Sequence, residues 1–327
     1  MSQRRIDEVL ASHENTTVSF EFFPPKTPAG MEKLKKRLEL FREQDPVFVD
    51  FTWGAGGSTS ALTMDLSAEA AAMGINVNMH LTCTNMPESL VHEALACARK
   101  HGIVNIVALR GDPPSGQDRW VVSEGGFSCA LDLVKFIRTE SKEHFGISVA
   151  GYPEGHPEVI KEVDSSKVHG LSEAEKGRLV KMEDKVFVCS DEDFQAELAY
   201  LKKKVDAGAN VIITQMFFDT KVFLTFVEAC RRIGISVPIV PGIMLISSLA
   251  GFNKMTAFCK TRVPDELRSK LDSIKDDAEA VKRFGIEFTT NLCKQLLDAG
   301  IRNLHFYTLN TEEATFAVLK NLNLLKT

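Results

Sequence analysis

Eight short apolar runs recur along this chain, and a longer amphipathic segment separates each run from the next. The runs are rich in β-branched and aromatic residues, which favours strands, while the segments between them have helical periodicity. Strands that alternate with helices in this way predict class α/β and a (βα)8 TIM barrel. The predicted strands lie near residues 18–23, 47–52, 76–81, 104–109, 147–152, 210–215, 237–240 and 302–307.

The segments between these runs predict helices that end in glycine. The clearest helices cover residues 31–44, 62–73, 87–100, 127–144 and 221–232. Glycine favours the left-handed conformation that closes many helices. The glycines expected to do so are Gly74, Gly102, Gly146, Gly208, Gly234 and Gly300.

The length predicts one barrel with additions. At 327 residues, the chain exceeds the roughly 250 residues typical of a TIM barrel. We expect a single catalytic domain over residues 1–327. A charged insertion at 159–194, after strand five, is expected to be a solvated helix-and-loop excursion, because it is too long for an ordinary connection. Extra helices are expected near 264–280, after strand seven.

Composition excludes several classes of function. A net charge of -5 argues against a nucleic-acid partner, which favours a basic surface. The seven cysteines are scattered without a CxxC motif, so neither a disulfide framework nor a metal site is predicted. The sequence has no apolar run of about 18 residues, so no membrane partner is expected and the predicted location is cytoplasmic.

Polar residues follow almost every predicted strand. The carboxyl ends of barrel strands form the active-site face, so polar groups there predict catalysis or binding. They are Glu21, Thr52, His80, Arg110, Asp112, Tyr152, Gln215 and Tyr307. Successive strand residues point to opposite faces, which places Ser19 and Glu21 on one face and Phe20 and Phe22 on the other. The same alternation groups Asn78 with His80, and Asn303 with His305 and Tyr307.

Glu21 is the leading catalytic candidate. It lies within SFEFFPP, and apolar surroundings would desolvate its carboxylate and raise its pKa. Such a carboxyl can act as a general acid near neutral pH, although a Glu paired with a buried cation remains an equal alternative from context alone. In ALRGDPP, Gly111 between Arg110 and Asp112 permits either a close approach of a ligand or a simple turn. The glycines of TWGAGGST match no nucleotide-binding motif.

Longer motifs carry a resemblance to a known family. In order, they are VSFEFFPPKT, DFTWGAGG, HLTCTNMP, NIVALRGDPP, VAGYPEGHPE, DAGANVIITQMFFD, PIVPGI and LHFYTLN. The sequence resembles the methylenetetrahydrofolate reductases over residues 18–310. The resemblance implies a flavoprotein that holds FAD and reduces 5,10-methylenetetrahydrofolate to 5-methyltetrahydrofolate, which supplies methyl groups for methionine synthesis. The electron donor would be NADPH or NADH, with NADPH favoured, and the two substrates would react by ping-pong kinetics.

The resemblance also implies roles for residues. Glu21 matches the general acid, and Asp112 matches the carboxylate that tunes the flavin. His80, Arg110 and Lys204 would donate to phosphate and ribitol oxygens. The implied FAD contacts are Thr52, Trp53, Ala55, His80, Leu109, Arg110, Gly111, Asp112, Cys129, Ala130, Tyr152, His156, Glu197, Tyr200, Lys203 and Lys204. The implied substrate contacts are Glu21, Thr52, Asp112, Gln215 and Tyr307.

Some positions depart from the family pattern. Glu197, Tyr200 and Lys203 replace other polar residues near the adenosine end, which the 159–194 insertion would cover. Met255 stands near the position of an aromatic residue that stacks on nicotinamide in bacterial members. Thr311 replaces an arginine, and Leu245 replaces a proline.

The end of the chain carries a further expectation. It stops 17 residues after Asn310, so we expect a form of the enzyme with only the catalytic domain. It would have no C-terminal regulatory domain and no response to S-adenosylmethionine, and a homo-oligomer is left open.

Two other functions are alternatives for a barrel of this kind. A barrel lyase or aldolase would need a Schiff-base lysine at a strand end or a phosphate site after strands seven and eight, and no predicted strand ends in lysine. A folate- or flavin-binding protein without turnover would bind ligand without chemistry that depends on Glu21.

Overall fold

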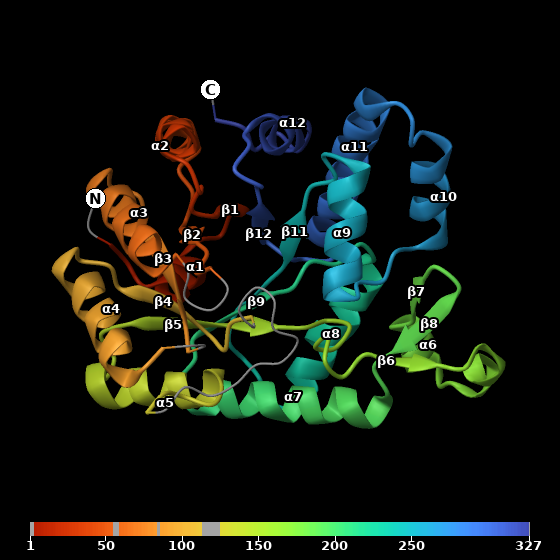
Figure 1. The fold of residues 1–327 in the computed structure, drawn as a ribbon, viewed down its shortest axis with the longest axis horizontal. Coiled ribbons are helices and arrows are strands. Elements are labelled where there is room, and N and C mark those ends of the chain that lie inside the picture. Colours follow the sequence, from red (N-terminus) through yellow and green to blue (C-terminus); the bar gives the residue numbers. More distant parts are fainter. Residues whose placement is uncertain (1–2, 55–58, 84–85, 113–124, 327) are drawn as a thin grey trace.

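The barrel is built from one parallel sheet whose strands follow the order β10-β9-β5-β4-β3-β2-β1-β12-β11. The computed structural model describes residues 3–54, 59–83, 86–112 and 125–326. Its barrel strands are β1 Thr17–Phe22, β2 Val49–Phe51, β3 Val77–Thr82, β4 Asn105–Leu109, β5 Gly146–Gly151, β9 Val211–Thr214, β10 Ile239–Val240, β11 Gly242–Met244 and β12 Asn303–Tyr307. All eight predicted strands are present, and the TIM-barrel prediction is confirmed (Figure 1).

The barrel closes through an interrupted seventh strand. Ile239 of β10 pairs with Ile212 of β9, and Gly242 of β11 pairs with His305 of β12. Between them lies Pro241, which has no N–H to donate to a neighbouring strand. The strand predicted over 237–240 therefore begins later than expected and continues beyond the proline to Met244.

Helices cover the outside of the barrel (Figure 1). They are α1 Ile6–Ser12, α2 Pro28–Glu43, α3 Ser60–Ala72, α4 Glu88–Lys100, α5 Ala130–Ser141, α7 Asp191–Asp206, α8 Thr220–Arg232, α9 Leu249–Cys259, α10 Asp265–Ser273, α11 Ala278–Asp298 and α12 Glu313–Asn321. The prediction of extra helices after strand seven is confirmed: α10 lies within the predicted 264–280, and α9 adds a helix before that segment.

Five of the six predicted closing glycines have positive φ, and Gly146 is the exception. Helix α5 already ends at Ser141, and Lys142 takes the positive φ of 47°. Gly146 instead begins β5. A Cβ at Gly146 would lie 2.8 Å from Oδ1 of Asn105, so close strand packing accounts for this glycine.

The insertion differs from the predicted helix-and-loop excursion. It forms a three-stranded antiparallel sheet of β6 Lys161–Val163, β8 Lys185–Val188 and β7 Val180–Met182, together with a 3₁₀ helix at Ser165–Gly170 and α6 Glu173–Gly177. The β7–β8 hairpin turns at Glu183, which has a positive φ of 51°. The sequence signal for this hairpin is a pair of short runs, Val180–Met182 and 186–188, rich in apolar and β-branched residues and separated by charged residues.

The insertion packs against the barrel's extra helices. Lys181 forms an ion pair of 2.7 Å with Asp265 of α10, and Nζ of Lys260 donates to the carbonyl oxygens of Pro157 and Ile160. The sheet of the insertion is therefore held beside α9 and α10, as Figure 1 shows.

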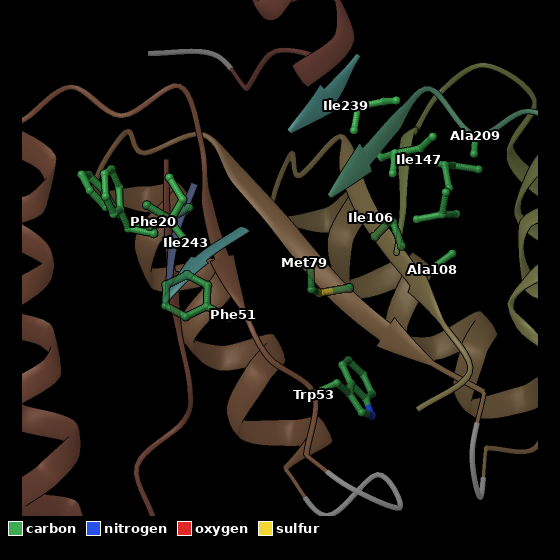
Figure 2. Close-up of a cluster of buried hydrophobic side chains, with 14 of the residues drawn as sticks. Phe20, Phe51, Trp53, Met79, Ile106, Ala108, Ile147, Ala209, Ile239 and Ile243 are labelled. Atoms are coloured by element: carbon green, nitrogen blue, oxygen red, sulfur yellow. The ribbon is translucent and has the colours of Figure 1, made fainter. Parts of the chain in front are cut away.

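Apolar side chains lie between the strands and the surrounding helices (Figure 2). Phe20 and Phe22 of β1 pack edge-on against Phe41 of α2, with ring centroids 4.7 and 4.9 Å apart. The predicted alternation is confirmed, because these outward side chains belong to the helix-facing layer. Polar residues on the opposite face, such as Ser19 and Asn78, are buried inside the barrel. Within the described part of the chain, no helix is long and apolar enough to cross a membrane.

Candidate active site

Glu21 lies near the carboxyl end of β1 with its side chain on the inner face of the barrel. Its Oε2 is 3.6 Å from Nε2 of His80 and 3.8 Å from Nε2 of His305. The side chain is 20% exposed, whereas its neighbours Phe20 and Phe22 point outward into the core. The apolar surroundings expected from SFEFFPP therefore face away from the carboxyl, because side chains alternate along a strand. Histidines surround the carboxyl instead.

Asp50 is a buried member of this site that the sequence analysis missed. It faces Glu21 directly in the register between β1 and β2, so both carboxyls point into the barrel. Its Oδ2 is 3.3 Å from Nε2 of His80 and 3.7 Å from Nε2 of His305, and the side chain is 1% exposed. The sequence signal for Asp50 is an acidic residue inside the apolar run VFVDF. The prediction of site residues used the polar residue at each strand end, which on this strand is Thr52.

Protonation in this group follows from burial and from hydrogen bonding. Burial raises the pKa of Asp50, and the hydrogen bond to His80 only partly opposes this effect. Burial disfavours a charged ring at His80, but its hydrogen bond to Asp50 and the charges of Glu21 and Asp50 prevail and raise the pKa of His80. Both directions mean that the Asp50–His80 pair keeps a proton to higher pH than isolated groups would.

Residues of β12 complete this side of the barrel. Nδ1 of His305 is 2.9 Å from Oγ of Ser19, and its ring stacks on Phe48 with centroids 5.4 Å apart. The hydroxyl of Tyr307 donates to the carbonyl oxygen of Thr214 at 2.7 Å. Burial raises the pKa of Tyr307 well above its usual value, so the phenol stays protonated. The side-chain oxygen of Gln215 accepts from the backbone N–H of Met216 at 2.9 Å.

A cavity of about 250 Å³ opens beside the ends of β4 and β5, against α5 and α7. Nine of the predicted FAD contacts line it: Leu109, Arg110, Cys129, Ala130, Tyr152, His156, Glu197, Tyr200 and Lys204. Val159 and Phe194, at the two ends of the predicted insertion, also line it. The sheet between those ends packs against α9 and α10 and contributes no side chain to the lining of this cavity.

Lys204 is a buried cation in this cavity. Its Nζ donates to the carbonyl oxygen of Ala150 at 3.0 Å and lies 5.1 Å from the ring centroid of Tyr200. Among the residues described, no carboxylate lies within 4 Å of this ammonium. Burial lowers the pKa of Lys204 to about 8 although Glu197 opposes the shift. A buried ammonium without a paired anion suits a negatively charged ligand.

Arg110 contacts an acidic residue that the sequence analysis did not select. Its two terminal nitrogens donate to Glu158 at 3.0 and 2.5 Å. Beside them, burial and the charges of Arg110 and Lys204 lower the pKa of His156 to about 4, against the pull of Glu158. The cavity therefore gathers cationic and neutral donors, with Glu158 as the carboxylate partner of Arg110.

Other predicted FAD contacts among the described residues lie outside this cavity. Gly111 has a positive φ of 89°, a conformation that favours glycine, and it carries Asp112 past the end of β4. Nε1 of Trp53 is buried without a hydrogen-bond partner among the described residues. Lys203 is exposed on α7 and does not line the cavity. Ala55 lies outside the described residues.

Comparison with known proteins identifies the family. The family model described as methylenetetrahydrofolate reductase matches residues 5–323. The chain belongs to the methylenetetrahydrofolate reductase family. Similar members include methylenetetrahydrofolate reductase (NADH) 1 of Arabidopsis thaliana, 50% identical over 98% of this chain and 51% of the relative. Methylenetetrahydrofolate reductase 2 of Saccharomyces cerevisiae is 40% identical over 99% of this chain and 50% of the relative. The chain thus spans about half the length of these relatives.

A bacterial reductase and a solved structure extend the comparison. The 5,10-methylenetetrahydrofolate reductase of Pectobacterium carotovorum is 33% identical over 93% of this chain and 89% of the relative. A Clostridium thermocellum protein, described as binding two copies of 5-methyl-5,6,7,8-tetrahydrofolic acid, aligns with a TM-score of 0.58. That alignment covers 98% of this chain and 97% of the other, at 13% identity, and shows the shared fold.

In this reductase-family chain, a second buried carboxyl lies outside the barrel interior. Glu154, after β5, is 5% exposed, and its Oε2 accepts the backbone N–H of Arg262 at 3.1 Å. Nε of Arg262 donates to Asp219 at 3.2 Å, and its Nη1 donates to the carbonyl oxygen of Leu179 in the insertion. Burial raises the pKa of Glu154 to about 8, against the hydrogen bond and charge of Arg262.

Glu154 is expected to make stability fall as pH rises. The folded protein retains a proton that the unfolded chain releases above its ordinary pKa of 4.5. Stability is therefore lost between pH 4.5 and about 8, by at most about 1.4 kcal/mol per pH unit. Glu154→Gln should flatten this decline and be the more stable protein at pH 8. Urea unfolding from pH 5 to 8 measures it, and parallel curves for the two proteins would contradict the expectation.

Proposed function

We propose that this protein is an FAD-dependent reductase that converts 5,10-methylenetetrahydrofolate to 5-methyltetrahydrofolate with NADH or NADPH. The observation that carries the proposal is the position of Glu21. Its partly exposed carboxyl lies near the carboxyl end of a barrel strand, 3.6 Å from a buried imidazole. A proton donor held in this way, in a chain of this family, suits a substrate nitrogen that must be protonated before reduction.

The cavity beside β4 and β5 supports FAD as the cofactor. When bound, FAD would accept hydride from the nicotinamide and deliver it to the methylene carbon of the folate. Lys204, Arg110 and His156 would hold its diphosphate region, because they supply donors in a partly enclosed space. The unpartnered Nε1 of Trp53 offers a further buried donor. These residues suit an anionic, aromatic group.

The protein's own residues would carry the proton chemistry. Glu21 would donate its proton to the folate nitrogen that is released when the methylene bridge opens, leaving a carbon that can accept hydride. Gln215 and Tyr307, from β9's end and β12, would position the substrate at the rim. Asp112 would place negative charge near the reacting ring system. We propose that His80, 3.6 Å from Glu21, serves this reacting end instead of the phosphate and ribitol oxygens implied by the resemblance.

The absorption spectrum of the purified protein tests the proposal. Under anaerobic conditions, a flavin spectrum should bleach when NADH or NADPH is added and return when methylenetetrahydrofolate follows. Comparing the two donors decides the preference: the resemblance favoured NADPH, while the printed names of plant relatives specify NADH. A protein that binds FAD but is never bleached would contradict the reductase and support a binding protein without turnover.

Lys204→Met should weaken FAD binding by about 10- to 100-fold, the range expected when a charged hydrogen bond is lost. The buried ammonium would no longer meet the anionic cofactor. Titration of the apoprotein with FAD, followed by flavin fluorescence, measures the change. Lys202→Met is the control, because Lys202 lies on the same helix but pairs with Asp206. Equal affinities for the Lys204 variant and the parent would remove Lys204 from the cofactor site.

We also propose a metabolic role for the product and a location for the protein. The product would supply methyl groups for methionine synthesis. All seven cysteines are free of disulfides, which suits the reducing cytoplasm that we propose as its location.

A further inference from the structure

Asp50 has no role in the reaction as described so far, yet it is the most deeply buried carboxyl of the active site. It faces Glu21 across the β1–β2 register. One side-chain oxygen or nitrogen from each of Glu21, Asp50 and His305 lies within 4.8 Å of the other two. Its Oδ1 has no hydrogen-bond partner among the described residues. Two carboxylates placed directly opposite on one face repel each other, so the arrangement requires a shared proton or a countercharge.

His80 is placed to supply that proton. One ring atom, Nε2, faces both carboxyls, at 3.3 Å from Asp50 and 3.6 Å from Glu21. The groups that face this cluster come from each adjoining strand: Glu21 from β1, Asp50 from β2, His80 from β3, and His305 with Tyr307 from β12. Within the part of the chain that the structure describes, Nε2 of His305 has no hydrogen-bond partner, and the hydroxyl of Tyr307 donates to the carbonyl oxygen of Thr214. Of these described groups, His80 makes the shortest contact with Asp50.

We propose that Asp50 is a positioning residue that holds a proton on His80 beside Glu21, so that Glu21 is returned to its acid form in each catalytic cycle. This inference rests on the proposed reductase function. The negative charge of Asp50 keeps His80 as an imidazolium whose Nε2–H lies between the two carboxyls. Asp50 does not touch the substrate and acts only through His80.

The proton movements balance over one turnover. Glu21 breaks its O–H bond and gives the proton to the folate nitrogen, becoming a carboxylate. The Nε2–H bond of His80 then breaks, and a new O–H bond forms at Oε2 of Glu21, leaving a neutral imidazole with its proton on Nδ1. Water reaches the partly exposed Glu21 side of the cluster and restores the lost proton. Reduction consumes one proton with each hydride, and this proton comes from solvent.

Asp50→Asn tests the proposal because it removes the charge and keeps the side-chain volume. Ring ¹⁵N resonances of the histidines, with His80 assigned through His80→Gln, should show that the variant loses the His80 proton at lower pH than the parent does. The rate of reoxidation of the reduced enzyme by methylenetetrahydrofolate should fall about tenfold at pH 7.5, less than removal of a general acid costs. In a plot of this rate against pH, the decline at high pH should begin at lower pH than in the parent. The rate at which the nicotinamide bleaches the flavin should stay within about twofold of the parent's.

Controls separate this role from general damage to the barrel. Thr17→Val removes a different hydrogen bond of β1, the partly buried 2.6 Å contact with Asn303. It should change neither the pH at which His80 loses its proton nor the pH dependence of the folate step. If Asp50→Asn does not fold, His80→Gln should produce the same loss in the folate step alone. An unchanged titration of His80 and an unchanged pH dependence of the folate step would overturn the proposal. A shifted titration in a protein that never reduces folate would retain the proton pair and reject the reductase function.

Discussion

Replacing Glu21 with glutamine is expected to slow the oxidation of reduced flavin by methylenetetrahydrofolate by roughly 10²- to 10⁴-fold, the contribution typical of a general acid. Glutamine keeps the shape of the side chain but has no acidic proton for the folate nitrogen. NADH or NADPH should still bleach the flavin at nearly the parent rate, because hydride transfer to the cofactor needs no proton from Glu21. Stopped-flow absorbance of the two half-reactions measures both effects.

Glu39→Gln provides the control for the Glu21 experiment. Glu39 is exposed on α2, so the same chemical change there should leave both half-reactions unaltered. Equal losses in the two half-reactions of Glu21→Gln would mean that Glu21 supports cofactor binding or folding, and the acid assignment would be withdrawn. A selective loss in the folate step would make the Asp50 experiment the next test.

Gly242→Ala should lower the free energy of unfolding by at least about 2 kcal/mol, in the range found for overpacked cores. A Cβ at Gly242 in β11 would collide with the carbonyl oxygen of Thr214 and with the ring of Tyr307. The carbonyl belongs to the backbone of β9 and cannot rotate away. The same carbonyl accepts the hydroxyl of Tyr307, so this rim residue should move and weaken folate binding.

Chemical denaturation measures the effect of Gly242→Ala, and Gly177→Ala is the matched control. A Cβ at Gly177 in α6 would meet nothing within 4 Å, so its substitution should change stability little. If both variants unfold at the parent's denaturant concentration, then the space around Gly242, where the barrel closes, is larger than the structure indicates. A large loss at Gly242 alone would confirm that barrel closure depends on this glycine.

Much of the fold could be read from local patterns. Alternation along β1 separates Glu21 from Phe20 and Phe22, and it holds in the structure because a strand's side-chain period is set by its backbone. The eight strands follow from local composition, since each is a short run rich in β-branched and aromatic residues. The insertion was harder, because its hairpin strands are short and rich in charge, and charged residues indicate exposure more strongly than they indicate strand or helix.

The residues of the candidate site also differ in how far local sequence could predict them. The sequence determined that Glu21 lies near a strand end on the inner face, and the family resemblance implied cofactor contacts at both Lys203 and Lys204. It did not show that Lys203 is exposed while Lys204 is buried in the cavity, since a helix's orientation depends on what it packs against. Nor did it show that Glu158 binds Arg110.

Only the tertiary structure shows that Asp50 belongs to the candidate active site. In the sequence, Asp50 stands inside an apolar strand and not at its polar end. In the structure, the strand register sets it opposite Glu21, and the neighbouring strand places Nε2 of His80 3.3 Å from its Oδ2. Strand identity and side-chain parity are local properties, which a single sequence carries. The distance between two charged groups on different strands depends on how the whole barrel closes, and those contacts decide where its protons reside.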